Sequence, residues 1–524
     1  MKKLLSLLLA ALLALSVSSM ALAEEKSANI ALTNSIPSLN PLTLANAESS
    51  KYAISLIFLP LVDLDSELNF VPRLAQEITT DDHLHFTIRL REDAVWSDGL
   101  PVTAEDVAFS FLIAADPDSA NTALAMYSVE GTDDDGFVEP GADHIDGVEI
   151  VDEKTLAVTV KWPMALYTFE YNFGCYLLTV PKHVLEDVPR GDLLTLDWFN
   201  HPDVISGPYF VRDFDLEHYV HFEANPDYFE GEARIKYLNF NVVRSSQILS
   251  GLKAGEIDLV QQTMGSIPVE DYGAVRALEN VRAVNGTPVT NESVFINTAN
   301  VTDPRIRQAL LLGMDRQLVF ENLLEGNGEL VDGFLVSASP YYTDIGVTAY
   351  DPEKAASLIA EAKADGADTE LTWYMNGNET EWNQAVEYFA QSFADLGLTI
   401  HTRPVTFANL MTAAENLEFD IMSVEYTYAP VDPYTDVVWL LGGEGSWTGY
   451  LTDEIAAALE ATQELETVGE IAEQYRVVDT AMQQDPAMIS GWVKASLGAV
   501  SSRLVNAEPN VFGTFINVHE WDIR

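Results

Sequence analysis

Two pairs of histidines are the residues of this chain whose spacing suits a metal ion. They are His83 with His85, and His218 with His221. Imidazoles are common zinc ligands, but a stable site needs three or four ligands held together. Both pairs lie where apolar and polar residues alternate, as in a half-buried strand, and neither has a cysteine or a third histidine nearby. The pattern favours histidines that face solvent, and we expect no bound metal.

The sequence holds none of the short motifs that mark common catalytic sites, such as H-E-x-x-H, G-x-S-x-G, a Walker loop or G-x-G-x-x-G after a strand. The single cysteine, Cys175, lies in an apolar, aromatic run typical of a packed thiol. Residues 133–136 (D-D-D-G) resemble a calcium loop weakly, but Gly131 and Ala142 stand where such a loop needs acids. A glycosidase-type carboxylate pair stays open, because no spacing among the 81 acidic residues singles one out. We expect neither catalytic residues nor a cofactor.

The charge of the chain argues against nucleic acid as a partner. Twenty-eight Lys and Arg stand against 81 Asp and Glu, a net charge of −53. Such a field repels phosphates and attracts cations. The acids are spread along the whole chain, which favours a role in solubility over steering of a cationic ligand. With 524 residues, 48% of them hydrophobic, the chain should form roughly two to four packed domains.

The N-terminus has the pattern of a secretory signal. Lys2 and Lys3 precede an apolar run over residues 4–17, and Ala21-Leu22-Ala23 forms an A-x-A cleavage site. A membrane anchor is the alternative, but serines interrupt the run. No cysteine stands at the cleavage site, so we expect no lipid anchor there. We predict a signal peptide over residues 1–23 and a secreted protein that is periplasmic or associated with the cell surface.

Local signals place strands and helices that alternate as in an α/β protein. Residues 27–33 read as an apolar strand. Thr103 and Asp106 form a capping box that starts a helix running through Ala115. Asp-Pro pairs at residues 303–304 and 351–352 each begin a helix, with the aspartate as cap and the proline in the first turn.

A second series of elements predicts a parallel-sheet lobe. Strands are expected at residues 371–375, 398–401 and 419–424, with helices at 381–396 and 407–416 between them. Gly397 should end the first of these helices. No low-complexity linker separates the expected lobes, so the chain must cross between them through ordered strands, which suits a hinge.

Several motifs along the chain resemble one known family. The segment W-S-D-G-L-P-V-T-A-E-D-V at residues 96–107, preceded by a strand that ends in Leu90-Arg91, is similar to the signature of the family 5 solute-binding proteins of ABC importers, the oligopeptide-, dipeptide- and nickel-binding group. Further similar segments follow in the family's order at residues 38–41, 71–75, 206–209, 225–229, 255–258 and 303–310. Most of these residues are turns and caps, so they identify the fold without contacting a ligand.

The resemblance implies an α/β, two-lobed periplasmic-binding-protein-like fold of type II, with an extra inserted domain and a ligand cleft between lobes joined by a strand hinge. The expected lobe I comprises residues 24–46, 182–284 and 494–524. The extra domain is expected at residues 47–181 and lobe II at residues 285–493. Solute would bind between the lobes, which close on it.

The resemblance also points to a binding loop at residues 425–433, E-Y-T-Y-A-P-V-D-P. In peptide-binding relatives an aspartate of this loop pairs with the peptide's ammonium group, but the matching position here is Ala429. Either Glu425 or another acid replaces it, or the ligand has no free amine. The loop and nearby aromatic residues give the candidate ligand-binding set, which is Tyr426, Tyr428, Asp432, Glu425, Trp447, Tyr450, Tyr127 and Trp492.

The functional hypothesis is the solute-binding subunit of an ABC importer, a monomer that captures a small peptide or peptide-like molecule and delivers it to the permease subunits. A non-peptide solute on the same fold, such as an oligosaccharide, an opine or another polar metabolite, is the alternative. A secreted hydrolase and a signalling or chaperone-like receptor are the other two alternatives.

Overall fold

The computed structural model describes residues 25–43, 48–119, 124, 126–377, 379–428, 430–442, 446–465 and 467–524. The predicted signal peptide at residues 1–23 and the position of Ala429 lie outside the described residues. Within the described ranges, no helix has both the length and the apolar character needed to cross a membrane.

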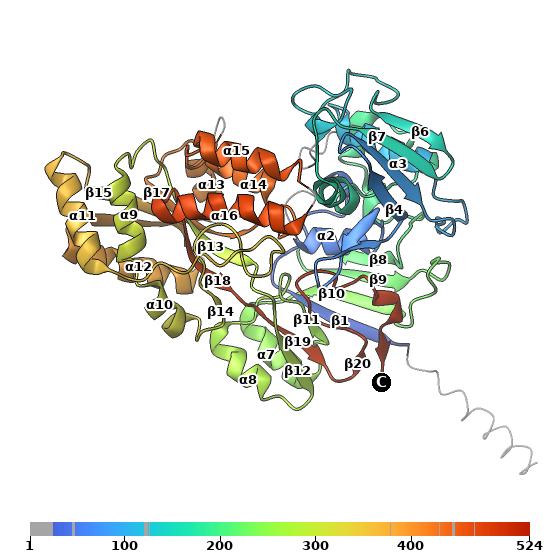
Figure 1. Ribbon diagram of the computed structural model, residues 1–524. Helices are drawn as coiled ribbons and strands as arrows, with labels where there is room; N and C mark the ends of the chain where they lie inside the picture. Colours follow the sequence, from blue (N-terminus) through green and yellow to red (C-terminus); the bar gives the residue numbers. More distant parts are fainter. Residues whose placement is uncertain are drawn as a thin grey trace, which may run out of the picture.

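A seven-stranded mixed sheet forms the first body, which we call lobe I (Figure 1). Its order is β12-β19-β11-β1-β10-β9-β8, and β1 runs parallel to both β10 and β11. The strands are β1 (Ser27–Leu32), β8 (Tyr209–Asp215), β9 (Tyr219–Ala224), β10 (Tyr237–Val242), β11 (Leu259–Val260), β12 (Val281–Asn285) and β19 (Leu497–Ser501). Lobe I also contains four helices, which are α5 (Lys182–Leu185), α6 (Arg190–Leu193), α7 (Ser245–Ala254) and α8 (Tyr272–Arg276). A separate strand pair, β20 (Leu504–Val505) with β21 (Asp522–Ile523), completes it.

The second body, lobe II, is built on a six-stranded sheet of order β14-β18-β13-β17-β15-β16. Its strands are β13 (Thr290–Ile296), β14 (Gly328–Glu329), β15 (Glu370–Asn376), β16 (Thr399–Val405), β17 (Ile421–Thr427) and β18 (Met488–Lys494). Its helices are α9 (Pro304–Gly313), α10 (Arg316–Leu323), α11 (Pro352–Ala364), α12 (Thr380–Leu396), α13 (Phe407–Glu415), α14 (Tyr434–Leu441), α15 (Asp453–Thr462) and α16 (Val468–Gln484).

The predicted β–α–β–α–β series of lobe II is confirmed. Strands β15, β16 and β17 alternate with α12 and α13, and β15 pairs in parallel with both other strands. Gly397 ends α12 with a φ of 94°, a left-handed conformation that glycine adopts without a steric penalty. The predicted Asp-Pro helix starts at α9 and α11 are also confirmed, with the Asp303 and Asp351 side chains accepting backbone N–H bonds.

A third body, the inserted domain, carries the four-stranded antiparallel sheet β4-β5-β7-β6. Its strands are β4 (Ala75–Thr80), β5 (His85–Leu90), β6 (Val148–Asp152) and β7 (Thr155–Thr159), and its helices are α3 (Ala104–Ala115) and α4 (Leu166–Phe169). Helix α2 (Glu48–Ser55) and the strand pair β2 (Val62–Leu64) and β3 (Phe70–Pro72) precede it. One continuous apolar core runs from this domain into lobe I. The expected boundaries of the three parts stay a prediction.

The residues of the 96–107 motif form a hydrogen-bonded hub around one carboxylate. Asp106 is 5% exposed, and its Oδ2 accepts bonds from the Thr103 backbone N–H at 2.8 Å and the Trp96 indole at 3.4 Å. Its Oδ1 accepts from the backbone N–H of Lys182 at 2.9 Å. The capping box is thus confirmed, and the motif ties α3 to the chain that enters α5.

Two short segments connect lobe I with lobe II. Residues 286–289 lead from β12 to β13, and residues 495–496 lead from β18 to β19. The segments touch each other, because the Gly286 N–H donates to the Ser496 carbonyl at 2.8 Å. A Cβ atom at Gly286 would lie 3.0 Å from that carbonyl oxygen and 2.9 Å from Cγ of Gln262. Glycine is therefore needed for this close approach of the two hinge segments.

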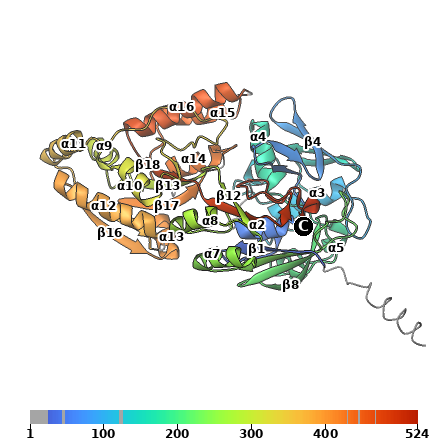
Figure 2. The same cartoon turned by 90° about the horizontal axis from the view of Figure 1, so that it is seen from below.

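Lobe II also contacts the inserted domain, away from the hinge. The Thr168 hydroxyl donates to Oδ1 of Asp432 at 3.2 Å, and the Asn172 amide donates to Oδ2 at 3.3 Å. The Tyr167 hydroxyl donates to the carbonyl of Thr462 at 3.3 Å. Figure 2 shows α4 next to the end of α15, which agrees with these bonds. The structure is therefore a closed arrangement, in which the two sides of the molecule meet.

Candidate ligand-binding cleft

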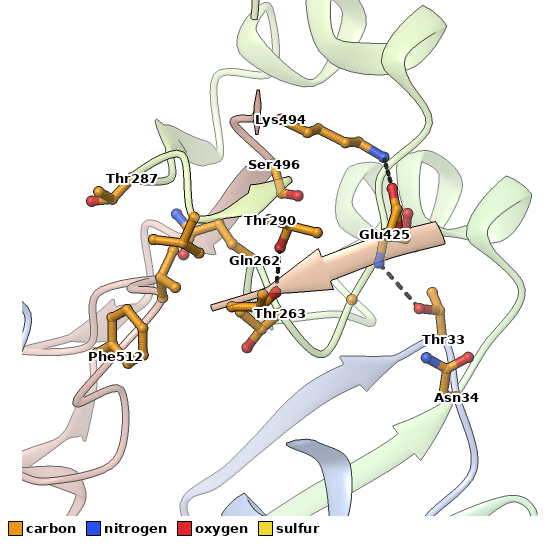
Figure 3. A pocket seen from close by; sticks show the side chains of 15 residues that line it. Thr33, Asn34, Gln262, Thr263, Thr287, Thr290, Glu425, Lys494, Ser496 and Phe512 are labelled. Carbon is orange, nitrogen blue, oxygen red and sulfur yellow. Dashed lines mark hydrogen bonds and ion pairs between the residues drawn. The ribbon is translucent and has the colours of Figure 1, made fainter. Parts of the chain in front are cut away.

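A cavity of about 330 Å³ lies where lobe I, lobe II and the hinge meet (Figure 3). It opens at the carboxyl ends of β1, β11 and β17, the edge at which α/β sheets commonly bind ligands. The lining residues are Thr33, Asn34, Gln262, Thr263, Gly265 and Ser266 from lobe I, Thr287, Val289 and Ser496 at the hinge, Thr290, Glu425, Thr427 and Lys494 from lobe II, and Val511 and Phe512 from the C-terminal segment.

Seven of the fifteen residues that line this cavity carry a hydroxyl group. Across β13 and β17, the hydroxyls of Thr290 and Thr427 lie 2.9 Å apart, and the Thr33 hydroxyl accepts the backbone N–H of Ser266 at 3.2 Å. Hydroxyls both donate and accept hydrogen bonds, so they can pair with either end of a peptide-like amide. The cavity therefore suits a small polar solute, with Val289, Val511 and the ring of Phe512 as apolar contacts.

The cavity wall carries two charged side chains, Glu425 and Lys494. Their Oε1 and Nζ atoms are 3.9 Å apart, and the side chains are 41% and 21% exposed. Burial alone would lower the pKa of Lys494, but the neighbouring Glu425, Tyr272, Glu381 and Glu292 raise it above its ordinary value. Lys494 therefore keeps its positive charge at neutral pH.

Of the eight predicted ligand-binding residues, Glu425 lines this cavity. Tyr426 and Tyr428 lie on the opposite face of β17 and its extension, with ring centroids 4.8 Å apart. The Tyr426 hydroxyl donates to Asp436 at 2.9 Å, while the Tyr428 hydroxyl bonds with that of Ser293 at 3.0 Å. Trp447 joins the same cluster, which packs inside lobe II. These three aromatic residues therefore lie together outside the cavity, and their contact with a solute stays a prediction.

The other four predicted residues lie apart from the cavity. Trp492 is buried against Trp382 with ring centroids 4.9 Å apart, and the Tyr450 hydroxyl donates to Asp485 at 3.0 Å. Tyr127 is 39% exposed and stacks on Trp162 in the inserted domain. Asp432 forms the contact between lobe II and the inserted domain, as described above.

Sequence reasoning missed most of the residues that line the cavity. Those after β1 and β11 are the clearest omission, because polar residues directly after a buried strand mark the carboxyl edge of a sheet. T-N at residues 33–34 and Q-Q-T at residues 261–263 follow this rule. Lys494 and Ser496 carried no such signal, since their place depends on the antiparallel pairing of β18 with β13.

No metal site accompanies the cavity in the described part of the chain. Within it, no group of three or more His, Cys, Asp or Glu side chains is arranged to hold an ion. His85 and His218 are exposed and pair with Asp82 and Asp215 instead.

Comparison with known proteins places these observations in a family. Residues 69–448 match the family model described as bacterial extracellular solute-binding proteins, family 5 Middle. The oligopeptide-binding protein AppA of Bacillus subtilis is 24% identical over 401 residues, which cover 72% of this chain and 69% of that protein. The periplasmic oligopeptide-binding protein OppA of Salmonella typhimurium is 26% identical over 408 residues, 74% of this chain and 72% of that protein. The structure of B. subtilis AppA in complex with a nonapeptide matches with a TM-score of 0.77 at 18% identity, covering 95% of this chain and 99% of that one.

Proposed function

We propose that this chain, which belongs to the bacterial extracellular solute-binding proteins of family 5, binds a small peptide or a peptide-like solute between its lobes and delivers it to the permease of an ABC importer. The observation that carries the proposal is the polar cavity bounded by both lobes and the hinge. Relatives named for oligopeptide binding support the peptide part of the proposal.

The cavity explains how binding and lobe closure are coupled. A solute there touches Thr33 in lobe I and Thr427 in lobe II at the same time, so its full set of contacts exists only when the lobes meet. A ligand that binds one state better shifts the population toward that state. The volume of about 330 Å³ lies near the lower end for ligand pockets and favours a short solute. Among the eight predicted residues, Glu425 is the one we place in contact with solute.

The same reasoning makes the protein a carrier and not an enzyme. A carrier must release its solute unchanged, and the cavity offers hydroxyls and one ion pair without an assembled nucleophile and base among its lining residues. Export by the N-terminal signal, an extracytoplasmic location and a monomeric state complete the proposal. The non-peptide alternative has no contact in this cleft that favours it.

The test is native mass spectrometry of the protein purified from its own host, followed by calorimetric titration with the solute found. We expect a retained short peptide that binds one to one and is recovered intact after prolonged incubation. Release of cleaved products would assign a hydrolase instead. A retained sugar or opine would replace the peptide while leaving the carrier function in place.

A further inference from the structure

A stacked pair of aromatic side chains lies on the surface of the inserted domain. Tyr127 and Trp162 are 39% and 45% exposed, and their ring centroids lie 6.1 Å apart with the ring planes at 26°. Neither residue lines the cavity described above. Single exposed apolar side chains are common on proteins, but two large rings side by side offer a partner a continuous apolar surface to cover. The pair is therefore a candidate for contact with another molecule.

The backbone presents these two rings rigidly. Ser128 follows Tyr127 and Lys161 precedes Trp162, and the backbone N–H of Lys161 donates to the carbonyl of Ser128 at 2.8 Å. Pro163 restricts the backbone of Trp162 on the other side. Rigid aromatic anchors lose little conformational entropy when they bind, and tyrosine and tryptophan carry much of the binding energy of protein interfaces.

The pair lies at the seam between the inserted domain and lobe II. Helix α4 follows Trp162 in the chain and bonds to Asp432 of lobe II, on the side where it approaches α15 (Figure 2). Burial raises the pKa of Tyr127, and Asp432 adds to the rise, so the Tyr127 hydroxyl lies near lobe II. Burial also raises the pKa of Tyr434 at the start of α14, and Glu460 followed by Tyr127 contributes. Lobe closure therefore sets Tyr434 near the stacked pair.

An acidic loop flanks the pair. The three aspartates at residues 133–135 are exposed, and Nζ of Lys161 donates to the carbonyl of Asp133 at 3.0 Å. A Cβ atom at Gly136 would lie 2.8 Å from the backbone nitrogen of Tyr127, so the loop packs directly against the segment that carries this ring. We call Tyr127, Trp162, Tyr434 and the loop at residues 133–135 the seam patch.

We propose that the seam patch is the surface through which the closed protein docks on its permease, and that the permease presents an apolar hollow rimmed by lysine or arginine. This inference rests on the proposed solute-binding function and names the surface that the delivery step uses. Tyr434 joins the other two rings only when the lobes meet. A partner that covers all three rings therefore binds the closed protein better than the open one and favours closure in return.

Charge argues against two other occupants of the seam patch. The aspartates at residues 133–135 repel the anionic headgroups of a membrane surface. In a two-fold dimer the same patch would face its own copy, so these acids would oppose each other in a chain of net charge −53. A permease surface with basic residues is instead attracted, which speeds the encounter.

The test measures docking on the importer and solute binding separately. The importer of the host is reconstituted in nanodiscs of neutral phosphatidylcholine, and the solute is the one that native mass spectrometry identifies. Biolayer interferometry gives the Kd of docking with and without solute, and titration calorimetry gives the Kd for solute. For the wild-type chain we expect solute to tighten docking, because closure completes the seam patch.

Variants show whether the seam patch causes docking. Trp162→Ala should weaken docking of the loaded protein at least about tenfold and leave the Kd for solute unchanged. Trp439→Ala is the matched control and should change neither constant, since Trp439 is also 45% exposed but packs on Trp447 within lobe II. Asp134→Lys should weaken docking at low salt, and the loss should shrink as salt screens the charge. A photo-crosslinking benzoylphenylalanine in place of Trp162 should attach to the permease, and one in place of Trp439 should not.

The outcomes separate this inference from the proposed function. Unchanged docking of Trp162→Ala, an equal loss in Trp439→Ala, or a loss of solute affinity in Trp162→Ala overturns the inference and leaves the carrier standing. Binding to phosphatidylglycerol vesicles, or a dimer in sedimentation, that Trp162→Ala abolishes assigns the patch to a membrane or a second copy and also overturns it. A wild-type chain that binds solute without docking on the importer overturns the proposed delivery and this inference together.

Discussion

Replacing Asp432 by asparagine should make lobe closure independent of pH. Asp432 is 2% exposed and receives bonds from Thr168 and Asn172 of the inserted domain, so separation of the lobes would return its carboxylate to water. Asparagine has the same shape. Its oxygen can accept from Asn172, and its amide can donate to the Thr168 hydroxyl, which in turn lies 3.4 Å from Oε1 of Gln463. The contact therefore survives the substitution while the titration disappears.

The size of the effect follows from the pKa of the carboxyl group. In the closed structure burial raises the pKa of Asp432 from 3.8 to about 7, Thr168 opposes the rise, and the nearby Asp436 adds to it. Asp432 also acts on five tyrosines, whose pKa values are raised so that they stay neutral in this range: Tyr127, Tyr167, Tyr341, Tyr434 and Tyr475.

The sign is set by which state holds the proton. With an ordinary pKa in the open state, the closed state binds one more proton between pH 3.8 and about 7. Closure is then favoured at low pH and loses about 1.4 kcal/mol per pH unit as pH rises through this window. A shift of about three pH units amounts to about 4 kcal/mol, or roughly a thousandfold in the closing equilibrium.

The assay is energy transfer between dyes on cysteines introduced at two exposed positions, Glu149 in the inserted domain and Glu353 in lobe II. The native Cys175 should stay unlabelled, because it is 4% exposed and burial raises its pKa well above the usual value. We expect the closed fraction of the wild-type chain to fall as pH rises from about 4 to about 7 and that of Asp432→Asn to stay high. Asp134→Asn, a change in an exposed loop of the same domain, is the matched control. The same pH response in wild type and Asp432→Asn would refute the reasoning.

Three further predictions concern stability and the hinge. Asp106→Asn should lower the free energy of unfolding, measured by urea titration, by about 1–3 kcal/mol, because an amide cannot accept every hydrogen bond that the carboxylate accepts. An unchanged urea midpoint would show that these hydrogen bonds do not stabilise the fold. Arg316→Met should lower the free energy of unfolding by about 3–5 kcal/mol, because it removes the buried cation that lies 2.6 Å from the carboxylate of Asp332, whose side chain is 2% exposed. Calorimetric melting measures this loss, and an unchanged melting temperature would show that the ion pair does not stabilise the fold. Gly286→Ala should lower the free energy of unfolding by about 1–3 kcal/mol, because the added methyl group crowds the two hinge segments. An unchanged free energy of unfolding together with normal lobe closure would show that the segments move apart to accommodate the methyl group.

Local elements were predictable because their causes lie within a few residues. The capping box of Thr103 and Asp106 satisfies backbone N–H groups of the helix that it starts, whatever surrounds it. The Asp303 cap and the Gly397 stop act in the same way. The motif at residues 96–107 identified the family for a related reason, since its residues maintain a turn and a helix start that the whole fold needs.

The candidate site was less predictable. The alternation along β17 shows that residues 425 and 427 share one face and residues 424 and 426 the other, but both faces carry large or polar side chains. Packing of Tyr426 against Phe295 and Trp447 places the aromatic face inside lobe II, which leaves Glu425 and Thr427 for the cavity.

The sequence by itself determined the elements, their order and the family, because caps, turns and hydrophobic periodicity act over short distances along the chain. Only the tertiary structure decided which polar residues meet. Thr33, Gln262, Glu425 and Lys494 are far apart in the chain and converge because the carboxyl ends of strands from two sheets face one gap. The surroundings of Glu292 have the same origin, because the pairing of β13 with β17 sets it opposite Glu425 and the fold leaves its side chain 1% exposed.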